Sequence, residues 1–102
     1  MAISNRLKLH DELLEFSDNV YFQPPSNIKL KQPCIIYNKT PSIKEYVNDH
    51  YYIKTQGYQI TVVDPDPDSL IADDLEDHFM HCAISQYFVS DNLNHVILNL
   101  YY

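Results

Sequence analysis

The segment "YQITVVD", residues 58–64, constrains the fold of this chain more than any other stretch. Apolar and polar side chains alternate along it, and a period of two residues is typical of a strand with one buried face. The two sets are Tyr58, Ile60 and Val62 on one face and Gln59, Thr61 and Val63 on the other. We therefore predict a strand here, and a fold that is built on a sheet.

Other segments carry weaker signals of the same kinds. A loose stripe of leucines predicts a helix from Ser4, its N-cap, to about Glu15. Apolar residues at helical spacing predict a second helix over residues 70–80, capped by Asp68 or Ser69. The remaining predicted strands are "VYF", which two prolines stop, and residues 33–39, 82–89 and 95–102.

Four irregular regions separate these elements. Residues 26–32 are predicted to be a polar connector, and residues 40–50, where no pattern holds, a loop or an irregular extension. Residues 51–53 are expected to pair with the clear strand across a turn at residues 55–57, and "SDNLN" predicts a hairpin loop longer than two residues.

These elements predict one α/β (α+β) domain over residues 1–102, in the order α-β-β-(β)β-α-β-β. A small, mostly antiparallel sheet of four to five strands is flanked by two helices. At 102 residues the chain has no room for a second core.

Composition excludes several functions. The formal charge of −7 argues against a general nucleic-acid binder, which must neutralise phosphates with Lys and Arg. A single glycine makes a phosphate-binding loop improbable. The first sixteen residues hold no long apolar run, so we expect neither a signal peptide nor a membrane span. Cys34 and Cys82 are expected to be buried thiols rather than a disulfide.

The acidic stretch "DPDPDSLIADDLEDHF", residues 64–79, is either a metal site or the entrance to a helix. A calcium loop needs a glycine at its tight turn and a bidentate Glu near its twelfth position, which this stretch lacks. Acids in a first helical turn complement the helix dipole, so the helix entrance is favoured. The nearby "HFMHC" cluster, with His78, His81 and Cys82, matches no zinc signature. We expect no metal and no other cofactor.

No residue stands out as a catalyst. There is no nucleophile motif, and Asp73 and Asp74 are neighbours along a helix, which points their carboxylates in different directions. The nine tyrosines leave two interpretations open: ordinary strand formers, or rigid contact area at a protein interface.

Three strings carry a family resemblance: "VYFQPPSNIKLKQPCIIYN", "YQITVVDPDPDS" and "DNLNHVILNLYY". Together and in this order they resemble small tail-terminator-like neck proteins of long-tailed bacteriophages. The likeness runs from about residue 7 to the C-terminus.

The resemblance implies a structural, non-enzymatic protein of the virion, made in the host cytoplasm. Subunits would form a homo-oligomeric ring, typically of six, that caps the tail tube and joins it to the head-completion (connector) proteins. Genomic DNA would pass through without specific binding, since an acidic wall repels phosphates. We expect no membrane partner. The acids placed on a lumen-facing or ring-facing surface are Asp64, Asp66, Asp68, Asp73 and Asp74. The residues expected at assembly interfaces are Pro24, Pro25, Lys29, Lys31, Tyr46, Tyr51, Tyr52, Asp91, Asn92, Asn94 and His95.

Two other functions stay open at this point. One is a head-completion or connector protein, which occupies the next ring along. The other is an acidic intracellular adaptor or inhibitor whose partner is a basic protein.

Overall fold

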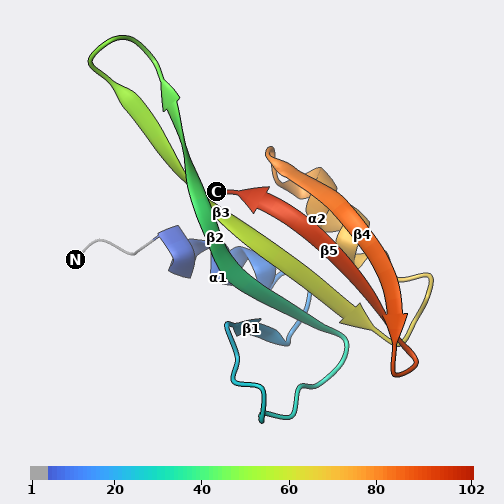
Figure 1. The fold of residues 1–102 in the computed structure, drawn as a ribbon. Coiled ribbons are helices and arrows are strands. Elements are labelled where there is room, and N and C mark those ends of the chain that lie inside the picture. Colours follow the sequence, from blue (N-terminus) through green and yellow to red (C-terminus); the bar gives the residue numbers. More distant parts are fainter. Residues whose placement is uncertain (1–4) are drawn as a thin grey trace.

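The computed structural model describes residues 5–102, which form one sheet with both helices on the same face (Figure 1). Ser4, the predicted cap of the first helix, lies outside the described residues. The elements are α1 (Asn5–Leu13), β1 (Val20–Phe22), β2 (Cys34–Tyr46), β3 (Tyr52–Asp64), α2 (Ile71–His78), β4 (Cys82–Ser90) and β5 (Leu93–Tyr101).

The five strands lie in the order β1-β2-β3-β5-β4. The short β1 pairs with β2 in parallel, and the other three pairs are antiparallel. Strand β3 is central, because Ile60 lies opposite Tyr37 of β2 on one side and Leu98 of β5 on the other. A small α+β fold with a mostly antiparallel sheet and two helices is therefore confirmed.

The core lies between the helices and one face of the sheet. The alternation along β3 is confirmed, since Tyr58, Ile60 and Val62 are all buried. Helices of nine and eight residues are too short to be stable alone, so packing on this face holds them. The helices contribute Leu9 and Leu13 of α1, Ala72 and Leu75 of α2, and Phe79, the C-cap of α2. The sheet contributes Ile35 and Tyr37 of β2, Leu98 and Leu100 of β5, and the three side chains from β3.

Polar contacts fix α1 over the β1–β2 side of the sheet. The phenol oxygen of buried Tyr37 lies 2.7 Å from His10 Nδ1 and accepts a bond of 3.3 Å from Arg6 Nη1. The Arg6 guanidinium also stacks 4.4 Å from the centre of the Phe22 ring. Helix α2 instead contacts β4 and β5, so each helix covers a different half of the sheet.

The prediction of a loop or an irregular extension over residues 40–50 is wrong for residues 40–46, which are strand, whereas residues 47–50 do lie in the turn between the two strands. Strand β2 continues to Tyr46 and pairs with a β3 that begins at Tyr52 (Figure 1). The turn predicted at residues 55–57 is also wrong, because Gly57 lies inside β3 opposite Thr40. Hydrogen bonds between β2 and β3 hold residues 40–55 although neither face of this part of the sheet is buried. The sequence there therefore shows no alternation of apolar and polar residues. The register shifts between Thr40 and Ile43, around a proline that cannot donate to a ladder.

Two turn details also differ from expectation. The N-cap of α2 is Leu70, with no side-chain cap, and Ser69 Oγ accepts only a long bond of 3.4 Å from the Ile71 N–H. The β4–β5 loop has two residues rather than more. Asp91 and Asn92 both have positive φ, 53° and 63°, as the tightest hairpin turns require.

The only glycine of the chain, Gly57, lies on β3 opposite Thr40 of β2, next to the register shift. A Cβ at Gly57 would meet Thr40 Oγ1 and would lie 2.7 Å from the Pro41 carbonyl oxygen. The second neighbour is backbone, so it cannot turn away as a side chain can. Glycine is thus required at position 57, because there is no room for a Cβ atom.

We expect Gly57→Ala to destabilise the fold by about 1–3 kcal/mol, as other overpacking substitutions do. Urea unfolding would measure the loss, with Gln59→Ala on the same strand as the control. Adding Thr40→Ala should restore little, because the Pro41 carbonyl remains in place. Full recovery in that double variant would contradict the steric account.

Candidate assembly surfaces

The distal halves of β2 and β3 form a projecting arm, defined here as residues 40–55. The arm extends well beyond both helices and ends in a turn far from the core (Figure 1). It gives the subunit its elongated shape, with extents of 51, 30 and 23 Å. The predicted interface residues Tyr46, Tyr51 and Tyr52 all lie on it.

Large apolar side chains cover the arm and face solvent. Five of them are between 51% and 74% exposed: Tyr46, Val47, Tyr51, Tyr52 and Ile53. Within residues 5–102, no other element packs over the tip. Scattered apolar residues are normal on a surface, whereas a contiguous group marks an interaction site.

The arm is nevertheless ordered internally. Lys44 Nζ lies 4.7 Å from the centre of the Tyr52 ring, and the Tyr46 and Tyr52 rings are 6.1 Å apart. At the tip, Asn48 Oδ1 accepts bonds from the N–H groups of His50 and Tyr51, at 2.8 and 3.1 Å. These contacts give the tyrosines a defined arrangement in a two-stranded ribbon, which is marginal in water without further packing.

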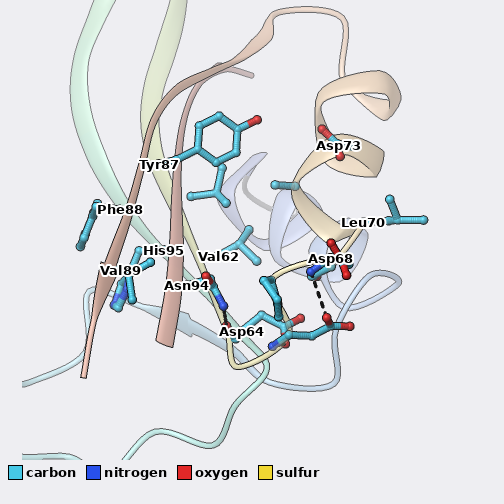
Figure 2. Close-up of a pocket in the computed structure, with 15 residues that line it drawn as sticks. Val62, Asp64, Asp68, Leu70, Asp73, Tyr87, Phe88, Val89, Asn94 and His95 are labelled. Atoms are coloured by element: carbon cyan, nitrogen blue, oxygen red, sulfur yellow. Dashed lines mark hydrogen bonds between the residues drawn. The ribbon is translucent and has the colours of Figure 1, made fainter. Parts of the chain in front are cut away.

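A groove opens at the end of β3 opposite the arm, between the entrance to α2 and the end of the β4–β5 hairpin (Figure 2). Its volume is about 560 Å³. The floor is apolar and includes Val62, Ala72, Tyr87, Val89 and Val96. The rim is polar and consists of Asp64, Asp66, Asp68, Ser69, Asp73, Asn94 and His95.

The aspartates of the rim also shape the chain that carries them. Asp64 Oδ1 accepts a 2.9 Å bond from the Asp66 N–H, and Asp66 Oδ1 accepts one of the same length from the Asp68 N–H. These bonds hold the proline-interrupted approach to α2. Four of the five predicted acidic residues line the groove, whereas Asp74 does not.

The predicted turn residues divide between the hairpin tip and the groove. Asp91 and Asn92 form the tip itself. Asn94 Nδ2 donates to the carbonyl oxygens of Asp64 and Pro65, at 3.2 and 3.3 Å, and so ties the hairpin to the α2 approach. His95 stacks on Phe88 with ring centres 4.6 Å apart.

The other predicted interface residues lie on the connector, defined here as residues 23–33, which joins β1 to β2. Pro25, Lys29 and Lys31 are exposed along it, and Pro24 is half-buried. Hydrogen bonds hold its backbone at both ends: the Gln23 N–H donates to the Tyr37 carbonyl at 3.0 Å, and Ser17 Oγ and Asn19 Nδ2 donate to the Pro33 carbonyl at 3.2 and 3.1 Å. Between the ends, the Ile28 N–H donates to the Pro25 carbonyl and the Lys31 N–H to the Tyr21 phenol, both at 3.3 Å. The connector joins the edge strand β1 to the start of β2, where Cys34 pairs with Val63 of β3.

The "HFMHC" residues take structural roles. His78 Nε2 lies 3.6 Å from Glu12 Oε1 and joins α2 to α1. Cys82 opens β4, where burial and the Glu76 carboxylate raise the pKa of its thiol to about 11. Cys34 is fully buried and both cysteines are free thiols. Across residues 5–102, no three His, Cys, Asp or Glu side chains are grouped as metal ligands would be.

Sequence reasoning missed the apolar floor of the groove and part of the arm. Tyr87 and Val89 alternate along β4, but the register shift between Ile84 and Gln86 breaks the pattern on which a sequence prediction depends. Val47 lies in the stretch that was interpreted as a loop, and Ile53 lies in residues 51–53, which were expected to pair across a turn at residues 55–57. The tyrosines proved mixed: Tyr37 and Tyr58 are buried core, and those of the arm are exposed.

No described protein family matches this chain in sequence, and no curated protein matches it. In the described part of the chain, no helix is long and apolar enough to cross a membrane.

We expect the free energy of unfolding to fall as pH rises from 9 to about 12. Burial and the neighbouring Glu12 carboxylate raise the pKa of Tyr102 to about 12, and that of Cys82 is raised as described above. Both groups hold their protons more tightly when folded, so their contribution is complete at lower pH and is lost on deprotonation. Urea unfolding under reducing conditions would measure this. The Cys82→Ala, Tyr102→Phe variant should lose less stability over that range, and an equal loss would contradict the assignment.

Proposed function

We propose that this chain is a structural subunit of a phage neck, a tail terminator that forms a ring on the tail tube and joins it to the head-completion protein. The arm is the observation that carries the proposal. It presents rigid tyrosines on a two-stranded ribbon, and within residues 5–102 nothing covers them. Such a ribbon is stabilised when a neighbouring subunit or the tube packs against it.

A closed ring of identical subunits also needs two different patches on each subunit. The separation of the exposed surfaces supports this. The connector lies at the β1 edge, the groove at the β4 edge, and the arm projects from the centre of the sheet. A subunit with different surfaces at its two edges is suited to head-to-tail contacts.

The charge supports a conduit for DNA. The net charge of −7 repels phosphates, so a genome can slide past without adhering. The same charge disfavours specific DNA binding. The resemblance of the three sequence strings to neck proteins agrees with this role.

Electron microscopy of lysates tests the proposal, using a phage with a nonsense mutation in this gene. Overlong, unattached tails beside filled heads are the expected result, because tube growth would lack its stop. Tails of normal length with leaking heads would instead indicate the connector function. Intact, infectious virions would contradict both and favour the adaptor.

Complementing that phage with variants tests the arm. Tyr46→Ser combined with Tyr51→Ser should leave folding within about 0.5 kcal/mol of wild type, since both side chains are exposed. It should lower the yield of infectious particles by about tenfold or more, as expected for loss of aromatic interface anchors. Met80→Ser is the control, because Met80 is 91% exposed and lies off the arm. Equal yields of infectious particles from both variants would contradict a role for the arm in assembly.

A further inference from the structure

The charges of this chain are segregated along the sequence. Seven of the fourteen acidic residues fall within residues 64–77, which contain no Lys or Arg. Residues 19–44 contain no acid and four of the seven basic residues. Four of the seven acids, Asp64, Asp66, Asp68 and Asp73, line the groove, and the basic group includes Lys29 and Lys31 of the connector.

These opposite charges are not paired within the subunit. In the part of the chain that the structure describes, the ion pair is that of His78 with Glu12. Lys29 and Lys31 of the connector are exposed, and so are Asp68 and Asp73 on the groove rim. The strand order places β1, which the connector follows, at one edge of the sheet and β4, which lines the groove, at the other, and no ion pair between the connector lysines and the groove aspartates is present among residues 5–102.

The groove also has apolar lining residues that are exposed to solvent. Tyr87 and Val89 of β4 line it and are 67% and 69% exposed, and Val96 of β5 lies between Tyr87 and buried Val62. The volume of about 560 Å³ falls within the roughly 300–1,000 Å³ of typical ligand clefts. Its occupant should therefore offer an apolar side chain flanked by cations.

The connector has that composition. Its sequence "IKLK", residues 28–31, alternates apolar and basic side chains, and Ile28 is 48% exposed. We propose that the groove of one subunit receives the connector of a second copy of this chain. Ile28 lies against the apolar floor, and Lys29 and Lys31 meet the carboxylates of Asp68 and Asp73.

This contact joins the β1 edge of one subunit to the β4 edge of the next. Because the two patches differ, each subunit uses both, and the contact is the head-to-tail kind that closes a ring. The inference deepens the proposed function and rests on it. It assigns the acidic α2 entrance to the ring contact rather than to the lumen.

Two charge-reversed variants isolate one contact in solution. Lys29→Glu with Lys31→Glu disables the connector and keeps the groove, whereas Asp68→Lys with Asp73→Lys disables the groove and keeps the connector. We would label the first with ¹⁵N and titrate it with the unlabelled second up to millimolar concentration. Saturable shifts should appear at the amides of Leu70, Tyr87 and Val89, and the affinity should fall with added salt.

Matched controls separate the connector from charge alone. Unlabelled Lys29→Glu, Lys31→Glu protein should shift nothing, or bind about tenfold or more weakly. Lys8→Glu with Lys39→Glu changes the charge equally at exposed sites off the connector, and when added to the groove-disabled partner it should leave the shifts intact. On the labelled chain, Asp74→Lys with Asp77→Lys alters the same helix outside the groove and should also preserve them.

Absence of shifts at millimolar concentration would overturn the inference, and so would equal shifts with the connector-disabled partner. Shifts at the groove on adding free lysine or a divalent cation alone, without response to the partner, would also overturn it and assign the groove to a small cation. These outcomes are independent of the lysate test. Overlong tails without a groove contact would leave the neck role standing and remove only this interface.

Discussion

The pairing of β2 with β3 is the constraint on which the rest of the structure depends. Its proximal half is the centre of the core, where Tyr37 lies opposite Ile60 beneath both helices. Its distal half is the arm, where the same ladder continues with no layer over it. Gly57 stands close to the junction, at the point where Pro41 interrupts the regular register. Core and arm are therefore two halves of one continuous strand pair, β2 with β3.

The sequence predicts the parts of this fold that have a buried face. Alternation over residues 58–64 and helical spacing over residues 70–80 both correspond to packed elements. The arm was missed because its ladder bonds are independent of side-chain burial, so exposed Lys44 and Glu45 serve there as well as apolar residues. The two-residue hairpin turn was missed because it requires Asp91 and Asn92 to adopt the left-handed backbone conformation. Asp and Asn tolerate this conformation but adopt it at only a minority of their positions, so their presence does not predict it. Of the candidate site residues, the sequence did not predict that Asp64, Asp66, Asp68, Asp73, Asn94 and His95 line one groove together with apolar residues of β3, β4, β5 and α2.

The arm and the groove both expose apolar side chains on an acidic subunit. Two short helices cover one face of the sheet, and the arm and the groove carry many of the exposed apolar side chains. The acidic charge keeps such exposed apolar groups soluble in the isolated subunit, since net charge opposes association. It also makes any self-contact dependent on the lysines of the connector. In this account the same charge separation limits premature association and specifies the neighbour.

The most direct test of the central claim is a cryo-electron microscopy map of the head–tail joint in the phage that encodes this chain. The account predicts a closed ring of this chain at the head-proximal end of the tube, with each arm packed against an adjacent subunit or the tube. A joint without this chain, or a ring whose arms project freely into solvent, would contradict it.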